Sequence, residues 1–556
     1  MTTANRKIRI VRALRIDIDP DYIRSCGKCF MVDTRDSVTD ACRIVCGDPQ
    51  DLHENSGFLG NGIVIELNGD RSIDILSSIT GMPVLYYYTT GRHTVFATNL
   101  EFLCGQLNPP LELDWNMVRR LAISGRLTPG QTLFASVKTI PPGTRIHVSR
   151  DGKISEAGRF EPSEILLESP EEYHKALRDT FRATLTRMDL EGSFLSLTAG
   201  LDTRTILAVI LEQGRRIDTI TISGVNPSID VRRASALAQA FGLPHKIVNL
   251  GSAYHDALPS LCESVSRLTG GLRSFSETPD LWLYKQLGSC YGARLSGNLG
   301  NQVGRCDSEG VGTRGARLDV LGRDGLSRKA LKPDTHWMLE AAGDEGIGSP
   351  RFLIQEESLS SSSANYDLGN SFCLQRTPYA DRKLISLKLL EPVTGNRKSL
   401  SAMRLKNLKH QFVGEPLKSS FQRQLICEVG GYISECPVNW GWRPRGGFDL
   451  SATTLGLGAF ADTALGMLGK RVPVLDTVRY AIGVSELAEF ERRAYIYHGT
   501  MPEFVRETVL CRHVRESGVF AMDRVVPLIN KGYYDRRNFA TIEFMLDLAL
   551  MVKNFL

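Results

Sequence analysis

One short stretch of this chain constrains its fold more than any other: residues 196–204, with the sequence SLTAGLDTR. An apolar run breaks there into a turn of hydroxyl and glycine residues, and the pattern predicts a helix over 205–213. Such a turn points several backbone N–H groups and the positive helix end at one place, which suits phosphate. Asp202 then lies where a Mg²⁺ ion bridging those phosphates would need a carboxylate. An ordinary strand-to-helix turn is the alternative.

The residues that follow continue an alternation of strand and helix. The short apolar runs 216–224 and 246–250 predict buried strands. Between them, 230–241 places apolar residues at i, i+3, i+4 and i+7 and ends before Gly242, which predicts an amphipathic helix. This order predicts an α/β fold with a doubly wound parallel sheet that binds a nucleotide at the carboxyl ends of its strands.

The stretch 196–204 resembles the pyrophosphate loop of ATP-pyrophosphatase ligases, written S-G-G-x-D-S, with Thr198, Ala199 and Thr203 replacing its first Ser, first Gly and last Ser. It is not a Walker loop, because no G-K-[ST] follows. Other segments are similar to landmarks of the asparagine synthetase family: 295–302 to S-G-D-G-G-D-E, 376–381 to R-x-P-F-L-D, 443–448 to R-x-K-x-G-F, and 517–529 with 539–555 to its C-terminal helical pair. The resemblance runs from about residue 57 to the end.

The resemblance implies two domains. Residues 1–165 would form an α+β sandwich of the N-terminal-nucleophile amidotransferase type, because 81–87, 96–98 and 132–143 are similar to its later strands. Residues 166–556 would form a doubly wound parallel-sheet ATP-pyrophosphatase domain, adenine nucleotide α hydrolase-like, with a helical C-terminus. The boundary is placed where prolines and glutamates interrupt the strands. A Gly- and charge-rich stretch, 305–365, predicts a long irregular loop, either a lid over the substrate or disorder.

The same resemblance implies ATP and Mg²⁺ as cofactors and assigns a set of site residues. Asp202 and Arg445 would act in catalysis, and Asp202 with Asn301 would hold the metal ion. The residues implied to bind the nucleotide are Thr198, Ala199, Gly200, Leu201, Thr203, Arg204, Ser223, Ser296, Gly297 and Gly300. Arg445 replaces the family's lysine and keeps the positive charge that stabilises departing pyrophosphate, but it cannot exchange protons near neutral pH.

Two positions of the second turn depart from the family pattern. Asn301 stands where the family has a second metal carboxylate, and Gln302 replaces the acid that follows it. An amide oxygen is a weaker ligand for Mg²⁺ than a carboxylate. Asp202 would therefore hold the ion mainly with the triphosphate's own oxygens, or together with Asp307.

A third departure concerns proton transfer. Leu374 stands where asparagine and β-lactam synthetases have a glutamate that is a candidate general base, and Asn298 replaces the tyrosine that accompanies this base in β-lactam synthetases. A base is needed when the attacking amine arrives protonated. The sequence therefore argues against both of these activities and favours a nitrogen nucleophile that is neutral near pH 7.

The N-terminus departs as well. Relatives that hydrolyse glutamine use a cysteine exposed by removal of the initiator Met, so that one residue supplies both nucleophile and base. This chain has Thr2 there, and a terminal threonine can act as a nucleophile in proteasome-like hydrolases. The apolar run 8–11 and the lack of a recognisable glutamine-holding motif favour an inert scaffold. The nitrogen must then come from outside or from the acylated substrate itself.

Three functions stay open. The first is an ATP-dependent ligase that adenylates a carboxylate, releases pyrophosphate and forms an amide with a nitrogen whose source is not glutamine, in specialised-metabolite or peptide macrolactam synthesis, as in the lasso peptide cyclases that the chain resembles. Holding both groups together supplies effective molarity in place of strong base catalysis. The second is sugar-acid amidation in polysaccharide assembly. The third is a non-catalytic descendant that binds a nucleotide or a partner.

Composition sets the remaining expectations. The balance of 67 Lys and Arg against 62 Asp and Glu is too mildly basic to indicate nucleic acid or an anionic membrane as partner. No apolar run approaches a spanning helix and the start lacks a signal-peptide pattern, which leaves a cytoplasmic protein as the expectation. The expected partners are small-molecule or peptide substrates and biosynthetic proteins, with a homodimer left open. Cys26, Cys29, Cys42 and Cys46 have zinc-ribbon-like spacing, but Cys42, Ile44 and Cys46 share a strand period, which favours buried thiols without metal.

Overall fold

The computed structural model describes four short strands within the first 59 residues, and then residues 60–68, 72–89, 94–107, 111–149, 153–162, 169–224, 228–305, 316–322, 349–390, 421–438, 443–446, 495–497, 499–533 and 538–556.

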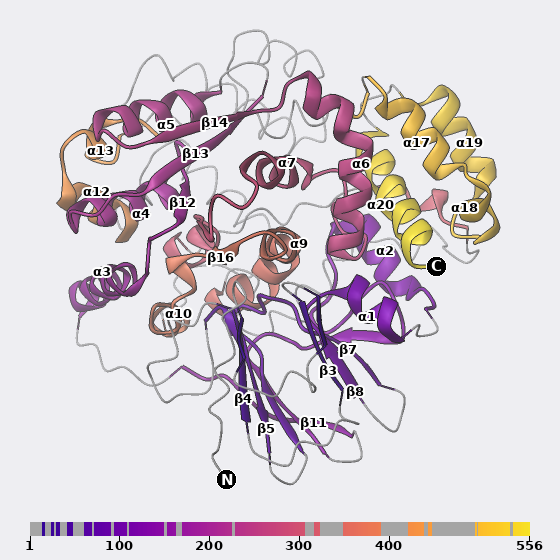
Figure 1. The fold of residues 1–556 in the computed structure, drawn as a ribbon, viewed down its shortest axis with the longest axis horizontal. Coiled ribbons are helices and arrows are strands. Elements are labelled where there is room, and N and C mark those ends of the chain that lie inside the picture. The colour runs from indigo at the N-terminus through magenta and orange to yellow at the C-terminus, as the bar shows by residue number, and fades with distance from the viewer. Residues whose placement is uncertain are drawn as a thin grey trace, which may run out of the picture.

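Two antiparallel sheets occupy the N-terminal part of the chain, in the lower half of Figure 1. The six-stranded sheet has the order β1-β4-β5-β6-β10-β11, with strands Leu14–Ile16, Cys42–Gly47, Gly62–Leu67, Ile73–Leu76, Thr144–Val148 and Ile154–Arg159. The five-stranded sheet has the order β2-β3-β8-β7-β9, with strands Arg24–Cys26, Cys29–Asp33, Thr94–Ala97, Tyr86–Thr89 and Val137–Thr139. Buried and half-buried side chains alternate along β10, so that one face of its sheet meets the core. Two helices, α1 (Leu100–Leu107) and α2 (Trp115–Ser124), complete this part.

A five-stranded parallel sheet follows, in the order β14-β13-β12-β15-β16. Its strands, in chain order from β12, are Ser193–Ser196, Asp218–Ser223, His245–Asn249, Ala293–Leu295 and Leu374–Arg376. The connecting helices are α4 (Leu201–Glu212), α5 (Ile229–Ala240), α6 (Ser252–Thr269) and α7 (Thr278–Leu287). Phe194 and Leu195 of the central strand are fully buried, as expected for a parallel strand covered on both faces. The predicted parallel α/β sheet is confirmed.

Helices from later in the chain complete the molecule. Beside the sheet lie α3 (Pro170–Arg187), α10 (Arg382–Leu389), α12 (Phe421–Val429) and α13 (Tyr432–Glu435), and α12 packs against both α3 and α4. The C-terminal helices are α17 (Met501–Val509), α18 (Arg512–Glu516), α19 (Met522–Lys531) and α20 (Phe539–Phe555), drawn in yellow beside α6 in Figure 1. Helix α20 is buried along 541–552 and packs against α6, α17 and α18, so it is a core helix. The predicted helical C-terminus is confirmed.

The sequence predicted one long irregular loop over 305–365, but the described part of this stretch contains regular elements. It contains a 3₁₀ turn at Leu318–Val320 and a π-helical turn at Phe352–Glu357, and helix α9 spans Ser358–Asn370. Helix α9 packs against α6 and α7, and these contacts outweigh the modest helix propensity of its four consecutive serines. The loop prediction was therefore wrong over α9, whereas 306–315 and 323–348 lie outside the described residues.

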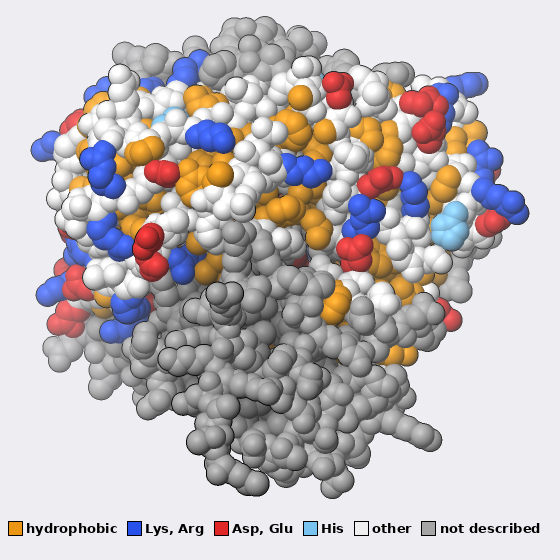
Figure 2. All heavy atoms as spheres, viewed as in Figure 1, with side chains coloured by type: hydrophobic (Ala, Val, Ile, Leu, Met, Phe, Trp, Pro, Cys, Tyr) orange, Lys and Arg blue, Asp and Glu red, His pale blue; other side chains and the backbone are white. Residues whose placement is uncertain are grey.

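The described surface is mixed in charge. Figure 2 shows blue and red side chains interspersed over the described part of one face, with apolar side chains between them. Among the described residues, no helix combines the length and the hydropathy that crossing a bilayer requires.

Candidate functional site

The loop that carries the pyrophosphate-loop pattern joins β12 to α4. Strand β12 ends at Ser196 and α4 begins at Leu201, with Gly200 as its N-cap at φ −65° and ψ 171°. The helix therefore begins before the predicted residue 205, which places Asp202 and Thr203 in its first turn. A carboxylate in the first turn is favoured because it faces the positive end of the helix dipole.

Each backbone N–H of residues 198–200 donates a hydrogen bond within the protein. Thr198 N donates to Thr203 Oγ1 at 3.1 Å, and Gly200 N donates to Thr198 Oγ1 at 3.2 Å. Ala199 N donates to Oδ1 of Asp230 at 2.8 Å, from the first turn of α5. Burial raises the pKa of Asp230, and its hydrogen bond from Ala199 opposes that rise. Asp230 was not singled out from the sequence, although a carboxylate in the first turn of the next predicted helix could have marked it as a residue near the loop.

The second glycine turn packs directly on Asp202. It follows β15, and a π-helical turn, Gly300–Arg305, begins within it. A Cβ placed on Gly300 would lie 2.4 Å from Cγ of Asp202, and one on Gly297 would lie 2.8 Å from its Cβ. Neither contact leaves room for a side chain. The two turns that the sequence singled out are therefore in contact, and the contact requires glycine at both positions.

The segment 376–381 joins the same place. The Thr377 hydroxyl donates to the carbonyl oxygen of Asn298 at 2.7 Å, which fixes the second turn. The fully buried Tyr379 donates from its hydroxyl to the carbonyl oxygen of Asp202 at 3.0 Å. Three of the sequence landmarks thus meet around the first turn of α4.

A residue that the sequence did not single out completes this cluster. Gln422, in the first turn of α12, is fully buried and donates from Nε2 to Oδ1 of Asp202 at 2.7 Å and to the Tyr379 hydroxyl at 2.9 Å. Its Oε1 is buried and has no hydrogen-bond partner among the described residues. No motif marks this glutamine, because its partners lie far away along the chain.

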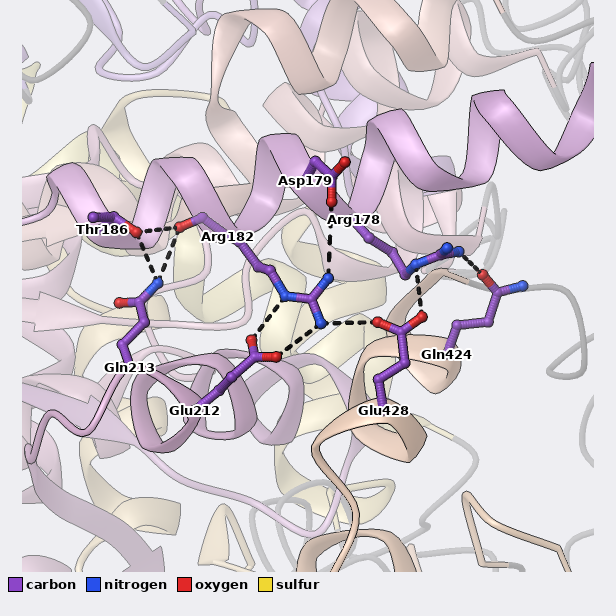
Figure 3. Close-up of polar contacts among 8 residues, drawn as sticks. All are labelled: Arg178, Asp179, Arg182, Thr186, Glu212, Gln213, Gln424 and Glu428. Atoms are coloured by element: carbon purple, nitrogen blue, oxygen red, sulfur yellow. Dashed lines mark hydrogen bonds and ion pairs between the residues drawn. The ribbon is translucent and has the colours of Figure 1, made fainter.

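An ion-pair network joins α12 to α3 and α4 (Figure 3). Arg182 of α3 pairs with Glu212 of α4 at 2.7 Å and with Glu428 of α12 at 2.8 Å. Arg178 pairs with the other oxygen of Glu428 at 2.9 Å and donates to Gln424. Gln424 and Glu428 lie on the same helix as Gln422, so the network fixes the end of α12 opposite to that glutamine.

A cavity of about 250 Å³ opens beside the loop, between the carboxyl ends of β12 and β13 and helix α7. Its apolar lining includes Leu197, Ile222, Leu250 and Leu283, and its polar lining includes Ser196, Thr198, Asp230, Asp280 and Arg294. Because Thr198 belongs to both the loop and the cavity wall, a molecule in the cavity would touch the loop. The cavity lies where ligands bind in open α/β sheets, at the carboxyl ends of the strands.

The donor set suits a divalent cation only in part. Mg²⁺ in proteins is commonly held by one or two carboxylates together with water and substrate phosphates. Asp202 supplies one carboxylate, Asn301 is half-buried next to Gly300, and Asp307 lies outside the described residues. No group of three or more His, Cys, Asp or Glu within the described part of the chain could hold a metal ion. The described residues thus suit an ion carried in by phosphates and not a resident one.

Two of the predicted site residues have other partners. Arg204 is fully buried and donates to the carbonyl oxygens of Ala199 and Pro437 at 3.0 Å each and to that of Cys436. It therefore ties the loop to the segment after α13, and burial lowers its pKa. Arg445 is largely exposed and pairs with Glu435 at 3.2 Å. Among the described residues, no hydrogen bond or ion pair joins Arg445 to the loop, and its catalytic role stays a prediction.

The remaining predicted positions lie at the edges of the site. Ser223 ends β13 and donates from its hydroxyl to the carbonyl oxygen of Gly224 at 3.0 Å. Ser296 continues β15, and Leu374 is a buried residue at the start of β16. Thr2 lies outside the described residues.

The four cysteines with zinc-ribbon-like spacing lie on two different sheets. Cys26 and Cys29 are paired residues of β2 and β3, whereas Cys42 and Cys46 belong to β4 in the other antiparallel sheet. Their side chains lie outside the described part of the structure, so the expectation of buried thiols stays a prediction.

Comparison with known proteins leaves the family of this chain unassigned. No protein-family model and no curated protein matches the sequence. Among solved structures, NMN synthetase from Francisella tularensis aligns at 16% identity and a TM-score of 0.19, over 25% of this chain and 58% of that one. The glutamine-dependent NAD+ synthetase from Acinetobacter baumannii, in complex with ADP, aligns at 16% identity and a TM-score of 0.18, over 67% of this chain and 66% of that one. The alignments thus span less than two thirds of either synthetase.

Proposed function

We propose that this chain is an ATP-dependent carbon–nitrogen ligase that adenylates a carboxylate, releases pyrophosphate and passes the acyl group to a nitrogen nucleophile. The observation that carries the proposal is the contact of the two glycine turns across Asp202, beside the cavity at the strand ends. In an open α/β sheet this edge is the ligand-binding edge, and a helix N-terminus there favours phosphate. The nucleoside would occupy the cavity and the phosphates would lie at the loop.

The finer assignment rests on the residues of the family pattern that this chain lacks. Leu374 cannot accept a proton, so the nucleophile would be a nitrogen that is neutral near pH 7, such as a peptide α-amine, with a reference pKa of about 7.7–8.0. The domain at 166–556 would carry this chemistry, and the antiparallel sheets of 1–165 would be a scaffold without glutaminase activity. Mg²⁺ would arrive with ATP, and Asp202 with Asn301 are the residues that would meet it.

The hydrogen bonds within the loop also favour a second candidate, a non-catalytic descendant that binds a nucleotide or a partner. The loop's donors are already paired, with Asp230 and with hydroxyls, and the Asp202 carboxylate is bonded to Gln422. A phosphate would have to displace these acceptors. Turnover therefore decides between the two candidates.

The test is ATP–pyrophosphate exchange with mixtures of candidate carboxylic and amino acids, with hydroxylamine present in a parallel assay to trap an acyl-adenylate as hydroxamate. We expect exchange by the native protein and a loss of at least about 100-fold in Asp202→Asn, which removes charge but keeps an acceptor for Gln422. Asp256→Asn, an exposed position on α6, is the matched control and should exchange at the native rate. ATP binding without exchange would support the second candidate, and an Asp202→Asn variant that exchanges normally would remove the loop from the site.

A further inference from the structure

A charged side chain emerges from the middle of the parallel sheet. Arg294 is the central residue of β15, in register with Phe194 of β12, and its side chain is about nine-tenths buried. Strands buried on both faces are normally apolar, because a buried charge needs partners to replace water. Arg294 also lines the cavity beside the loop. The contacts of Arg294 should therefore show which groups replace water around its charge.

The guanidinium group is fixed on two of its three nitrogens. Nε donates to Ser196 Oγ at 2.7 Å, and Nη1 donates to Asp280 Oδ1 at 2.7 Å and to the Tyr284 hydroxyl at 2.8 Å. Asp280 is held in turn by Asn365, which donates to its other oxygen at 2.7 Å. These bonds set the plane of the guanidinium before any ligand arrives.

The third nitrogen, Nη2, makes no hydrogen bond to any described residue. Because Arg294 lines the cavity and its other two nitrogens are held by protein acceptors, Nη2 is the nitrogen left to donate to a molecule inside it.

The surroundings select the kind of acceptor that would meet this donor. Asp280 already neutralises Arg294, and Asp230 lies in the same cavity wall, so a phosphate or carboxylate at the floor would face two acids. Ile222, Leu250 and Leu283 line the walls and suit a flat apolar surface. A neutral aromatic heterocycle with a ring acceptor satisfies both conditions, and purines carry such ring nitrogens.

We propose that Arg294 is the base-recognising residue of the site, donating from Nη2 to one ring nitrogen of adenine. This inference rests on the proposed function, because it needs a nucleotide whose phosphates lie at the Thr198–Gly200 loop. It makes Arg294 a specificity-determining residue, with Asp280 and Ser196 as the residues that position it.

The experiment uses the full-length native protein and measures binding of ATP, inorganic tripolyphosphate and the 1-deaza, 3-deaza and 7-deaza analogues of ATP by calorimetry in Mg²⁺ buffer. One analogue should bind roughly ten- to a hundredfold more weakly than ATP, because it loses a hydrogen bond from a charged donor. Tripolyphosphate, which has no base, reports on the loop alone.

Two variants then test whether Arg294 is the donor that makes one analogue bind more weakly. The double variant Arg294→Gln/Asp280→Asn removes both charges of the buried pair together and should bind that analogue and ATP with the same affinity, while its tripolyphosphate binding stays native. Arg512→Gln, an exposed position, should keep the native difference. If that double variant does not fold, equal binding of ATP and all three analogues by the native protein still refutes the inference.

The outcomes separate the inference from the proposed function. If ATP and tripolyphosphate bind but all three analogues bind as tightly as ATP, the role of Arg294 is refuted and the nucleotide site stands. If neither ATP nor tripolyphosphate binds, the proposed function fails and the inference fails with it.

Discussion

Gln422 and Asp202 lie 220 positions apart and are joined by a 2.7 Å hydrogen bond from Nε2 to Oδ1. The bond connects the first turn of α12 with the first turn of α4, and the Tyr379 hydroxyl shares the same donor. The amide thus covers one oxygen of the carboxylate on which the proposed nucleotide chemistry depends.

The first prediction follows from that contact. Gln422→Ala should lower the free energy of unfolding by about 1–3 kcal/mol, because it removes a buried hydrogen bond to a carboxylate. The same variant should lose ATP–pyrophosphate exchange. Gln424→Ala, on the same helix and half-buried, should cost no more than about 1 kcal/mol, because its partner Arg178 keeps an ion pair with Glu428. Equal losses in the two variants, measured by denaturant unfolding, would contradict the special role of Gln422.

The second prediction concerns the contact of the two turns. Gly300→Ala would place a methyl group 2.4 Å from Cγ of Asp202, so the turns must move apart. We expect a loss of about 1–3 kcal/mol in stability from this overpacking, together with loss of exchange. Gly105→Ala on α1 meets nothing within 4 Å and should be neutral or slightly stabilising. Thermal unfolding of both variants checks the prediction, which native-like behaviour of Gly300→Ala would disprove.

The third prediction uses the raised pKa of Asp230. As the pH falls through that pKa, the carboxylate that accepts from Ala199 becomes neutral, and its bond to the loop weakens. Inorganic tripolyphosphate should therefore compete better for the loop at lower pH. Asp230→Asn should bind tripolyphosphate more tightly than the native protein at pH 8, and this difference should shrink as the pH falls. Comparing the two proteins at each pH cancels the protonation of the ligand itself, and identical pH profiles would refute the prediction.

The fourth prediction concerns stability. Burial raises the pKa of Asp367, on α9, to about 7 from its ordinary value of 3.8, although its hydrogen bond from the Tyr86 hydroxyl opposes that rise. Between these values the native state binds a proton that the unfolded chain does not, so stability falls as the pH rises. Asp367→Asn should remove that fall and be more stable than the native protein above about pH 7, by roughly 1–3 kcal/mol. Urea unfolding at pH 5 and 8 measures it, with exposed Asp256→Asn as the variant that should show no change.

The sequence predicted the regular elements where hydrophobic period and length agreed. The strands 216–224 and 246–250 and the helix 230–241 match β13, β14 and α5 to within two residues at each end. The start of α4 was placed late, because the small residues of the loop continue into its first turn. Helix α9 was missed because its stability comes from packing against α6 and α7 and not from its serines.

The site was predictable as a pair of turns but not as a set of contacts. The glycines at 297 and 300 were identified by resemblance, and the structure adds the reason that they are needed. Gln422, Asp230 and Arg294 were not identified, because each acts through a partner on another element. Arg445 was assigned to the chemistry by resemblance, and the structure shows it largely exposed and paired with Glu435, so its catalytic role stays a prediction.

The close contact between Gly300 and Asp202 also limits how such a protein can change over generations. A side chain at position 300 is compatible with the fold only if residue 202 becomes smaller, and a larger residue at 202 is excluded while the second turn keeps its course. Neither turn can therefore be exchanged alone, and grafting a new specificity onto this scaffold would require replacing both turns as one unit.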